Sequence, residues 1–184
     1  MKIITIPHKS LRSIAKPILS VDKKLNQFVV DLGSTLQSAR NPRGVGLAAP
    51  QVDKGWRMFV MNLDRTLSVY INPRIEKHSD QKSFGLDPED PDLEGCLSMP
   101  NFYGAIPRWE WVTLEYDTIV GDTLQNTSHT FNNFAARVVQ HEVDHLDGIL
   151  FTDHSLTYDL PVYRQSPTDP DKYLTIDRAI LETI

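Results

Sequence analysis

Three residues in one short segment of the chain could bind and use a metal ion. His141, Glu142 and His145 form the pattern H-E-x-x-H. On a helix, two imidazoles four residues apart lie on one face, about 6 Å apart along the axis, where they can share one ion. The glutamate falls beside that face. The alternative is an ordinary helix that carries exposed histidine and glutamate side chains.

The neighbours of the two histidines favour the metal site over this alternative. Phe134 and Val138 continue the stripe of His141 and His145 toward the start of the segment. The histidines therefore belong to the inward face of the helix. Burying two imidazoles costs free energy unless both are paired, and one metal ion pairs both. We expect a buried metal site on this helix.

The third ligand is not part of this pattern. A tetrahedral catalytic site needs three protein ligands and an open position for water. An extended peptidase motif would place a histidine at position 151, which is Phe151, and Glu182 is far away near the end of the chain. Cys96 is the natural candidate, because a thiolate binds borderline and soft divalent ions well. Taken alone, a lone cysteine is more often a small buried hydrophobic residue.

Two helices are predicted to position this chemistry. Apolar residues recur at spacings of three and four over residues 22–40, where Asp22 can act as the N-cap, and they predict the first helix. The metal-site helix should begin near Asn133 and end near Leu146. Gly148 is then placed to end this helix in a left-handed conformation.

The middle of the chain has the patterns of an antiparallel sheet. Short strands are predicted at residues 57–63 and 67–71, and the apolar alternation of residues 111–117 predicts another. Residues 76–93 form an acidic, loop-like insertion. Residues 155–184 form a C-terminal tail of uncertain structure, loop-like as far as residue 172, with a short helix as one option from residue 174 onward.

Composition favours one domain over residues 1–184. The chain of 184 residues is 40% hydrophobic, which is enough for a continuous core. Its 19 basic and 24 acidic side chains give a formal charge of -5 without a long run of one sign, so neither nucleic acid nor anionic lipid is an expected partner. Residues 1–7 lack a secretory signal and no apolar stretch could span a bilayer, so we expect a cytoplasmic protein.

Three segments together resemble the peptide deformylase family. They are GVGLAAPQ at residues 44–51, EGCLS at residues 94–98 and QHEVDHLDG at residues 140–148. They occur in the order of the family, and the resemblance runs from about residue 3 to residue 154. The first segment also fits a dinucleotide-binding pattern, but a polar run precedes it and Pro50 interrupts any helix after it, so the context of that pattern is missing.

The resemblance implies an α+β fold with antiparallel sheets around a central metal-binding helix. It implies removal of the N-formyl group from the N-terminal methionine of new polypeptides, with release of formate, by attack of a metal-activated water. Glu142 would act as general base and then general acid. The Gln51 side chain and the Leu97 backbone N–H would stabilise the developing oxyanion. Three residues would hold the metal: Cys96, His141 and His145.

The resemblance also indicates a metal and a substrate site. It favours Fe(II), and Zn(II), Ni(II) and Co(II) suit the same ligands. The candidates for an apolar pocket for the methionine side chain are Val45, Phe134 and Val138, although the last two could equally be core residues. The substrate main chain could add like a strand near Val45, Gly46 and Gly95.

The expected partners are nascent peptides that begin with formyl-methionine. Transient association with the ribosome stays open, although the end of the chain lacks the basic face that docking to RNA requires. Glu94 and Arg108 could brace the loop of Cys96 or could form a surface ion pair. Two other functions stay open, namely a metallopeptidase or other metal amidase, and an inactive binding module that keeps the fold.

Overall fold

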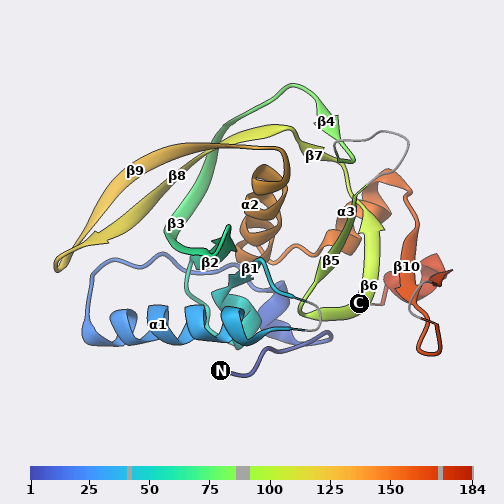
Figure 1. Cartoon of the computed structure of the whole chain (residues 1–184), viewed down its shortest axis with the longest axis horizontal. Coiled ribbons are helices and arrows are strands. Elements are labelled where there is room, and N and C mark those ends of the chain that lie inside the picture. Colours follow the sequence, from blue (N-terminus) through green and yellow to red (C-terminus); the bar gives the residue numbers. More distant parts are fainter. Residues whose placement is uncertain (41–42, 86–91, 170–171, 184) are drawn as a thin grey trace.

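The computed structural model describes residues 1–40, 43–85, 92–169 and 172–183 of the chain. Its architecture is α+β, as predicted, with all strand pairings between named strands antiparallel. Helix α2 lies in the middle, between a large curved sheet and a smaller sheet (Figure 1). The chain therefore surrounds the segment that carries the H-E-x-x-H pattern.

The described strands form three sheets. The five-stranded sheet has the order β1 (Gly46–Ala48), β2 (Met58–Leu63), β3 (Thr66–His78), β8 (Trp111–Val120) and β9 (Thr123–Asn132). The four-stranded sheet has the order β11 (Tyr173–Thr175), β10 (Val162–Gln165), β6 (Met99–Ala105) and β5 (Leu93–Cys96). The third sheet pairs β4 (Lys82–Ser83) with β7 (Arg108–Trp109). Strands β1 and β5 are thus edge strands of two different sheets.

The helices include both predicted ones. Asp22 caps α1, since its Oδ1 accepts a hydrogen bond of 2.7 Å from the backbone N–H of Leu25. Gly148 follows α2 with a φ of 72°, which is the left-handed conformation predicted for it. The described helices are η1 (Lys9–Arg12), α1 (Lys23–Ser38), η2 (Ala49–Val52), α2 (Asn133–Leu146), α3 (Phe151–Tyr158) and α4 (Arg178–Leu181).

Two segments predicted as loop-like contain regular structure. Residues 76–78 end β3, residues 82–83 form β4, and Leu93 begins β5, while residues 86–91 lie outside the described part. The predicted tail contains the end of α3, strands β10 and β11, and helix α4. These strands form by pairing with distant segments, such as β4 with β7 and β10 with β6. Their short sequences carry no alternation that would have predicted them.

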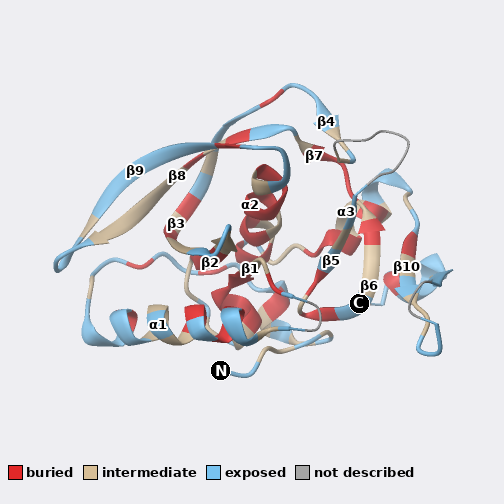
Figure 2. Ribbon diagram, in the orientation of Figure 1, coloured by how far each residue is buried: buried red, intermediate tan, exposed pale blue. Residues whose placement is uncertain are grey.

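The hydrophobic core holds one face of α2 against a sheet. This face packs Ala136, Val139 and Val143 against the five-stranded sheet, in a cluster that includes Phe59 and Leu114. Figure 2 shows buried residues along α2 and along the strands on both sides of it. Amphipathic burial of this kind fixes the rotation of a helix about its axis. In the part of the chain that the structure describes, no helix is long and apolar enough to cross a bilayer.

Candidate functional site

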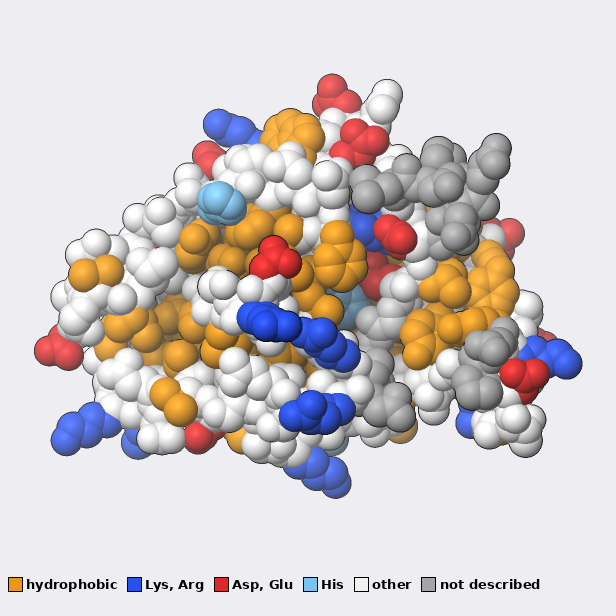
Figure 3. Space-filling model, viewed as in Figure 1, with side chains coloured by type: hydrophobic (Ala, Val, Ile, Leu, Met, Phe, Trp, Pro, Cys, Tyr) orange, Lys and Arg blue, Asp and Glu red, His pale blue; other side chains and the backbone are white. Residues whose placement is uncertain are grey.

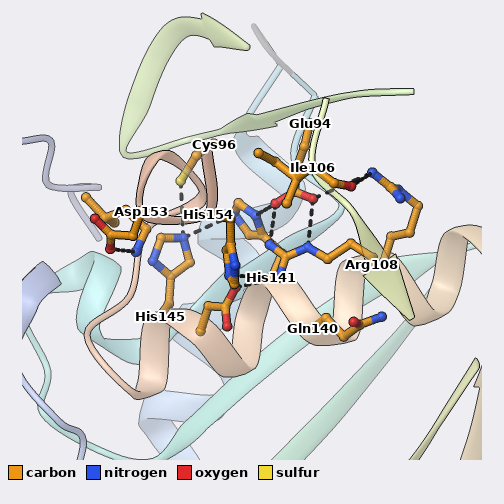
Figure 4. Close-up of polar contacts among 12 residues, drawn as sticks. Glu94, Cys96, Ile106, Arg108, Gln140, His141, His145, Asp153 and His154 are labelled. Carbon is orange, nitrogen blue, oxygen red and sulfur yellow. Dashed lines mark hydrogen bonds and ion pairs between the residues drawn. The ribbon is translucent and has the colours of Figure 1, made fainter. Parts of the chain in front are cut away.

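Three candidate metal ligands from two layers of the fold converge at one point. Cys96 ends β5, and His141 and His145 lie one turn apart on α2 (Figure 4). The Nε2 atom of His145 is 3.1 Å from Cys96 Sγ and 3.2 Å from His141 Nε2. The ligand atoms of all three residues lie within 4.8 Å of one another. The H-E-x-x-H pattern contains two of these residues, and the end of β5 places Cys96, the third candidate named from the sequence, next to them.

The donor set fits a divalent transition metal. Both histidines turn Nε2 toward the sulfur, and His141 Nδ1 lies 2.7 Å from Glu94 Oε1. A carboxylate on one ring nitrogen fixes the tautomer, which leaves the lone pair of the other nitrogen free for a metal. Two imidazoles and a thiolate are ligands that Zn(II) and Fe(II) accept. An ion at this point would pair three groups at once, of which Cys96 and His145 are buried.

The surroundings of Cys96 favour the thiolate form of its side chain. Burial alone would raise its pKa, but the positive charge of His145 and hydrogen bonds with both histidines lower the pKa of Cys96 to about 5. The backbone N–H of Ser98 also lies 3.4 Å from the sulfur. Cys96 is therefore a thiolate at neutral pH, which is the form that binds metals.

Glu142 is buried beside the cluster and has an unusual pKa. Its Oε2 has no hydrogen-bond partner among the described residues, and only 3% of the residue is exposed. Burial raises the pKa of Glu142 to about 7, although the charges of His141 and His145 act in the opposite direction. Room for this carboxylate depends on Gly46, because a Cβ at that position would overlap Glu142 Oε1.

Gln51 lies within the site, as its motif suggested. Its Oε1 accepts a hydrogen bond of 2.8 Å from the backbone of Ala48, which fixes the amide plane. Its Nε2 then lies 3.5 Å from Cys96 Sγ and 3.2 Å from Ser98 Oγ. Leu97 follows Cys96 in the turn between β5 and β6. These positions place an amide N–H group next to the candidate ligands.

A buried network of charges braces the cluster from behind. Arg108 donates to both oxygens of Glu94 at 2.6 and 3.0 Å, and its side chain is 3% exposed. It also pairs with Asp144 at 2.5 Å, and His154 lies 2.8 Å from the same carboxylate. Glu94 and Arg108 are thus a brace rather than a surface ion pair. Burial would raise the pKa of Glu94, but the charge of Arg108, together with the contact to His141, holds it well below its usual range.

Sequence reasoning missed several of these contacts. Glu94 contacts the His141 ring, whereas Gln140, the residue before His141, hydrogen-bonds the backbone of Trp109 in both directions. His154 had no signal in the sequence, and Ser98 appeared only as the last residue of the segment EGCLS, without a role. These contacts join segments that are far apart in the sequence, such as β5 and α2 or α3 and α2, and no spacing along the chain encodes how those segments meet.

A cavity of about 250 Å³ opens onto the candidate ligands. Figure 3 shows a hollow on this face with hydrophobic side chains around it. Every predicted site residue except His145, which lies behind Cys96 and His141, lines the cavity. Arg137 lines it as well and was not predicted, although it lies one turn before His141 on α2. Val45, Gly46, Gly95, Phe134 and Val138 are thus brought together, and their roles stay predictions.

Known proteins match this chain over most of its length. Residues 1–159 match the family model described as polypeptide deformylase. A peptide deformylase of Roseiflexus castenholzii is 38% identical over 161 residues, which cover 79% of this chain and 80% of that protein. A peptide deformylase of Rhodopirellula baltica is 40% identical over 160 residues, with 83% of this chain and 72% of that protein covered. The crystal structure of peptide deformylase from Thermotoga maritima has a TM-score of 0.73 and 32% identity, and the match covers 83% of this chain and 95% of that one.

Proposed function

Because the chain belongs to the polypeptide deformylase family of hydrolases, we propose that it removes the N-formyl group from the N-terminal methionine of newly synthesised polypeptides. The observation that carries this proposal is the buried cluster of Cys96, His141 and His145, with Glu142 beside it, at the wall of one cavity. Water is the second substrate, and the products are formate and a free amino terminus.

Cys96, His141 and His145 would hold one divalent ion. Such an ion supplies Lewis acidity, which lowers the pKa of water toward neutrality and polarises a carbonyl oxygen. Glu94 would orient His141 through its Nδ1, and Arg108 would keep Glu94 ionised for that purpose. We propose Fe(II) as the native ion, with Zn(II), Ni(II) and Co(II) as replacements that suit the same ligands.

Glu142 would carry the proton in both halves of the reaction. A pKa of about 7 lets one carboxylate accept a proton from water and return it to the leaving amine near neutral pH. No described residue forms a hydrogen bond with Glu142 Oε2, so this oxygen could accept and return the proton. Glu142 is a catalytic base in this proposal and not a metal ligand.

Gln51 and Leu97 would stabilise the oxygen of the tetrahedral intermediate. The Gln51 amide is fixed through its Oε1, so its N–H group is oriented before any substrate binds. The backbone N–H of Leu97, next to Cys96, would be the second donor. Donors that are fixed in advance need little reorganisation during the reaction.

The substrate main chain would bind between two sheet edges. Gly46 of β1 and Gly95 of β5 line the same cavity, and both strands are edges of their sheets. An extended peptide can pair with such edges through its backbone, which accepts many sequences. Val45, Phe134 and Val138 would then contact the side chain of the first residue. Since the proposed substrates are newly made chains, we place the activity in the cytoplasm, and transient contact with the ribosome stays a prediction.

The test is formate release from a formyl-methionyl peptide by protein whose metal content is measured. The protein should be purified without oxygen and compared with samples loaded with zinc or nickel. Acetyl-methionyl peptides and internal peptide bonds should stay intact. Cleavage of either would favour the broader metal amidase, and a protein that releases no formate with a full metal site would contradict the proposed function.

A further inference from the structure

Arg137 places a cation in the wall of the cavity, next to two of the three residues proposed to contact the first side chain of the substrate. It lies on α2 between Phe134 and Val138, and all three line the cavity. The Arg137 side chain is only 9% exposed. A buried cation is an unexpected wall for a pocket that would hold an apolar methionine side chain.

The hydrogen bonds of Arg137 leave part of its capacity unused within the described residues. Its Nη1 donates to the carbonyl of Ser83 at 3.1 Å, and its Nη2 donates to the carbonyl of Ile106 at 2.9 Å. A guanidinium has five N–H donors in a fixed plane. These two carbonyls anchor the group at the cavity wall without using all of them.

Among the described residues, two carboxylates lie near the charge of Arg137, Glu94 and Asp92, and neither accepts a hydrogen bond from it. Its ion pair with Glu94 spans 3.9 Å, which is too long for a hydrogen bond. The oxygens of Glu94 already accept two hydrogen bonds from Arg108 and contact His141. Burial accordingly lowers the pKa of Arg137, although arginine stays charged at neutral pH. A further hydrogen-bond acceptor beside the Arg137 guanidinium would therefore be stabilised.

We propose that Arg137 lets the pocket accept a first residue whose side chain carries a hydrogen-bond acceptor, so that the protein also deformylates N-formyl-methionine sulfoxide peptides. This inference rests on the proposed function. The sulfoxide keeps the unbranched chain of methionine and adds a polar oxygen. Phe134 and Val138 would contact the hydrocarbon part while Arg137 donates to the oxygen. The formyl C–N bond is hydrolysed by water as before, and the sulfoxide is unchanged.

The experiment compares three tripeptides that differ only in the first residue. These carry formyl-methionine, formyl-methionine sulfoxide or formyl-norleucine, which has no sulfur and cannot be oxidised to a sulfoxide. The readout is the ratio of kcat/KM for the sulfoxide to that for norleucine, so that changes in overall activity or folded fraction cancel. In the wild-type protein we expect a ratio within about tenfold of one, because the sulfoxide oxygen stays paired.

Two variants isolate the contribution of Arg137. Arg137→Met keeps an unbranched side chain without donors and should lower the ratio by about 10- to 100-fold, the range for a buried acceptor left unpaired. Arg74→Met removes an exposed cation, with a side chain 68% exposed, and should leave the ratio unchanged.

The outcomes separate this inference from the proposed function. A wild-type ratio below about one hundredth, the loss expected without a partner for the oxygen, would overturn the role of Arg137 even if Arg137→Met does not fold. An unchanged ratio in folded Arg137→Met would overturn it as well. No formate from any of the three peptides would overturn the proposed function, and the inference with it.

Discussion

At the scale of single residues, the contact between Glu142 and Gly46 joins two segments that are far apart in the sequence. The carboxylate occupies the volume that any Cβ at position 46 would need. Glycine is therefore required there because of a close approach and not because of its own backbone conformation. The sequence motif around Gly46 and the pattern around Glu142 are two halves of one arrangement.

Replacement of Glu142 by glutamine should separate metal binding from turnover. Glu142→Gln keeps the size of the side chain but cannot accept a proton, so formate release should fall by about 100-fold or more while the metal stays bound. Metal content and kcat are measured on the same purified sample.

His145→Ala is the control for this variant, since it should lose metal and turnover together. Near-normal turnover of Glu142→Gln would mean that another group carries the proton. An empty metal site in the same variant would mean that Glu142 is a ligand or a structural brace.

A methyl group at position 46 should reproduce much of this loss without touching the carboxylate chemically. Gly46→Ala forces Glu142 out of its position, and we expect kcat to fall by about tenfold or more, up to the loss expected for a missing base. Gly55→Ala is the matched control, because a Cβ there meets nothing within 4 Å. Equal activity of the two variants, with equal metal content, would contradict the dependence of Glu142 on Gly46.

At the scale of elements, the sequence predicted the two long helices better than the short strands. Helix α2 was predicted at both ends, because its apolar stripe and Gly148 are local signals. Strand β4 consists of two residues held by pairing with β7, and its sequence carries no periodicity. Elements that exist only through distant partners cannot be predicted from local patterns.

The end of α2 should be sensitive to any side chain at position 148. Gly148 has a φ of 72°, and its Cβ would lie 2.8 Å from the backbone C and O atoms of Arg12. Gly148→Ala should therefore lower the free energy of unfolding by about 2–4 kcal/mol, from backbone strain and overpacking together.

Gly121→Ala separates these two causes. Gly121 has a similar φ of 61° but open space around its Cβ position, so its replacement should cost only the strain, about 1–2 kcal/mol. Both values come from denaturant unfolding with the same bound metal. Equal losses for the two variants would mean that Arg12 moves aside freely.

At the scale of the whole molecule, the candidate metal site joins two sheets. Cys96 belongs to the four-stranded sheet, whereas His141 and His145 lie on the helix packed against the five-stranded sheet. The family motifs predicted these ligands, and the sequence also named Glu94 and Arg108. The buried links to Asp144 and His154 were not predictable, because they depend on how the layers meet.

Metal removal should therefore weaken the fold and not only the activity. An ion that binds the folded chain alone adds about 4 kcal/mol when its concentration exceeds Kd by a thousandfold. Chelation should lower the midpoint of thermal unfolding, and restored metal should raise it. Cys96→Ser binds metal more weakly, since an alcohol is a poor anionic ligand at neutral pH, so its midpoint should respond much less. An equal response in Cys96→Ser would point to a different third ligand.

The two short edge strands beside the cavity also restrict which conformation of a substrate could bind there. β1 and β5 have three and four residues, and both line one cavity instead of presenting a long open edge to other molecules. A substrate that pairs with them would bind as a single extended strand, which residues already paired in a sheet or packed in a core cannot provide without local unfolding. A polypeptide whose first residues already belong to a sheet or a core could therefore no longer bind in this way. Under the proposed function, removal of the formyl group would therefore come before the substrate folds.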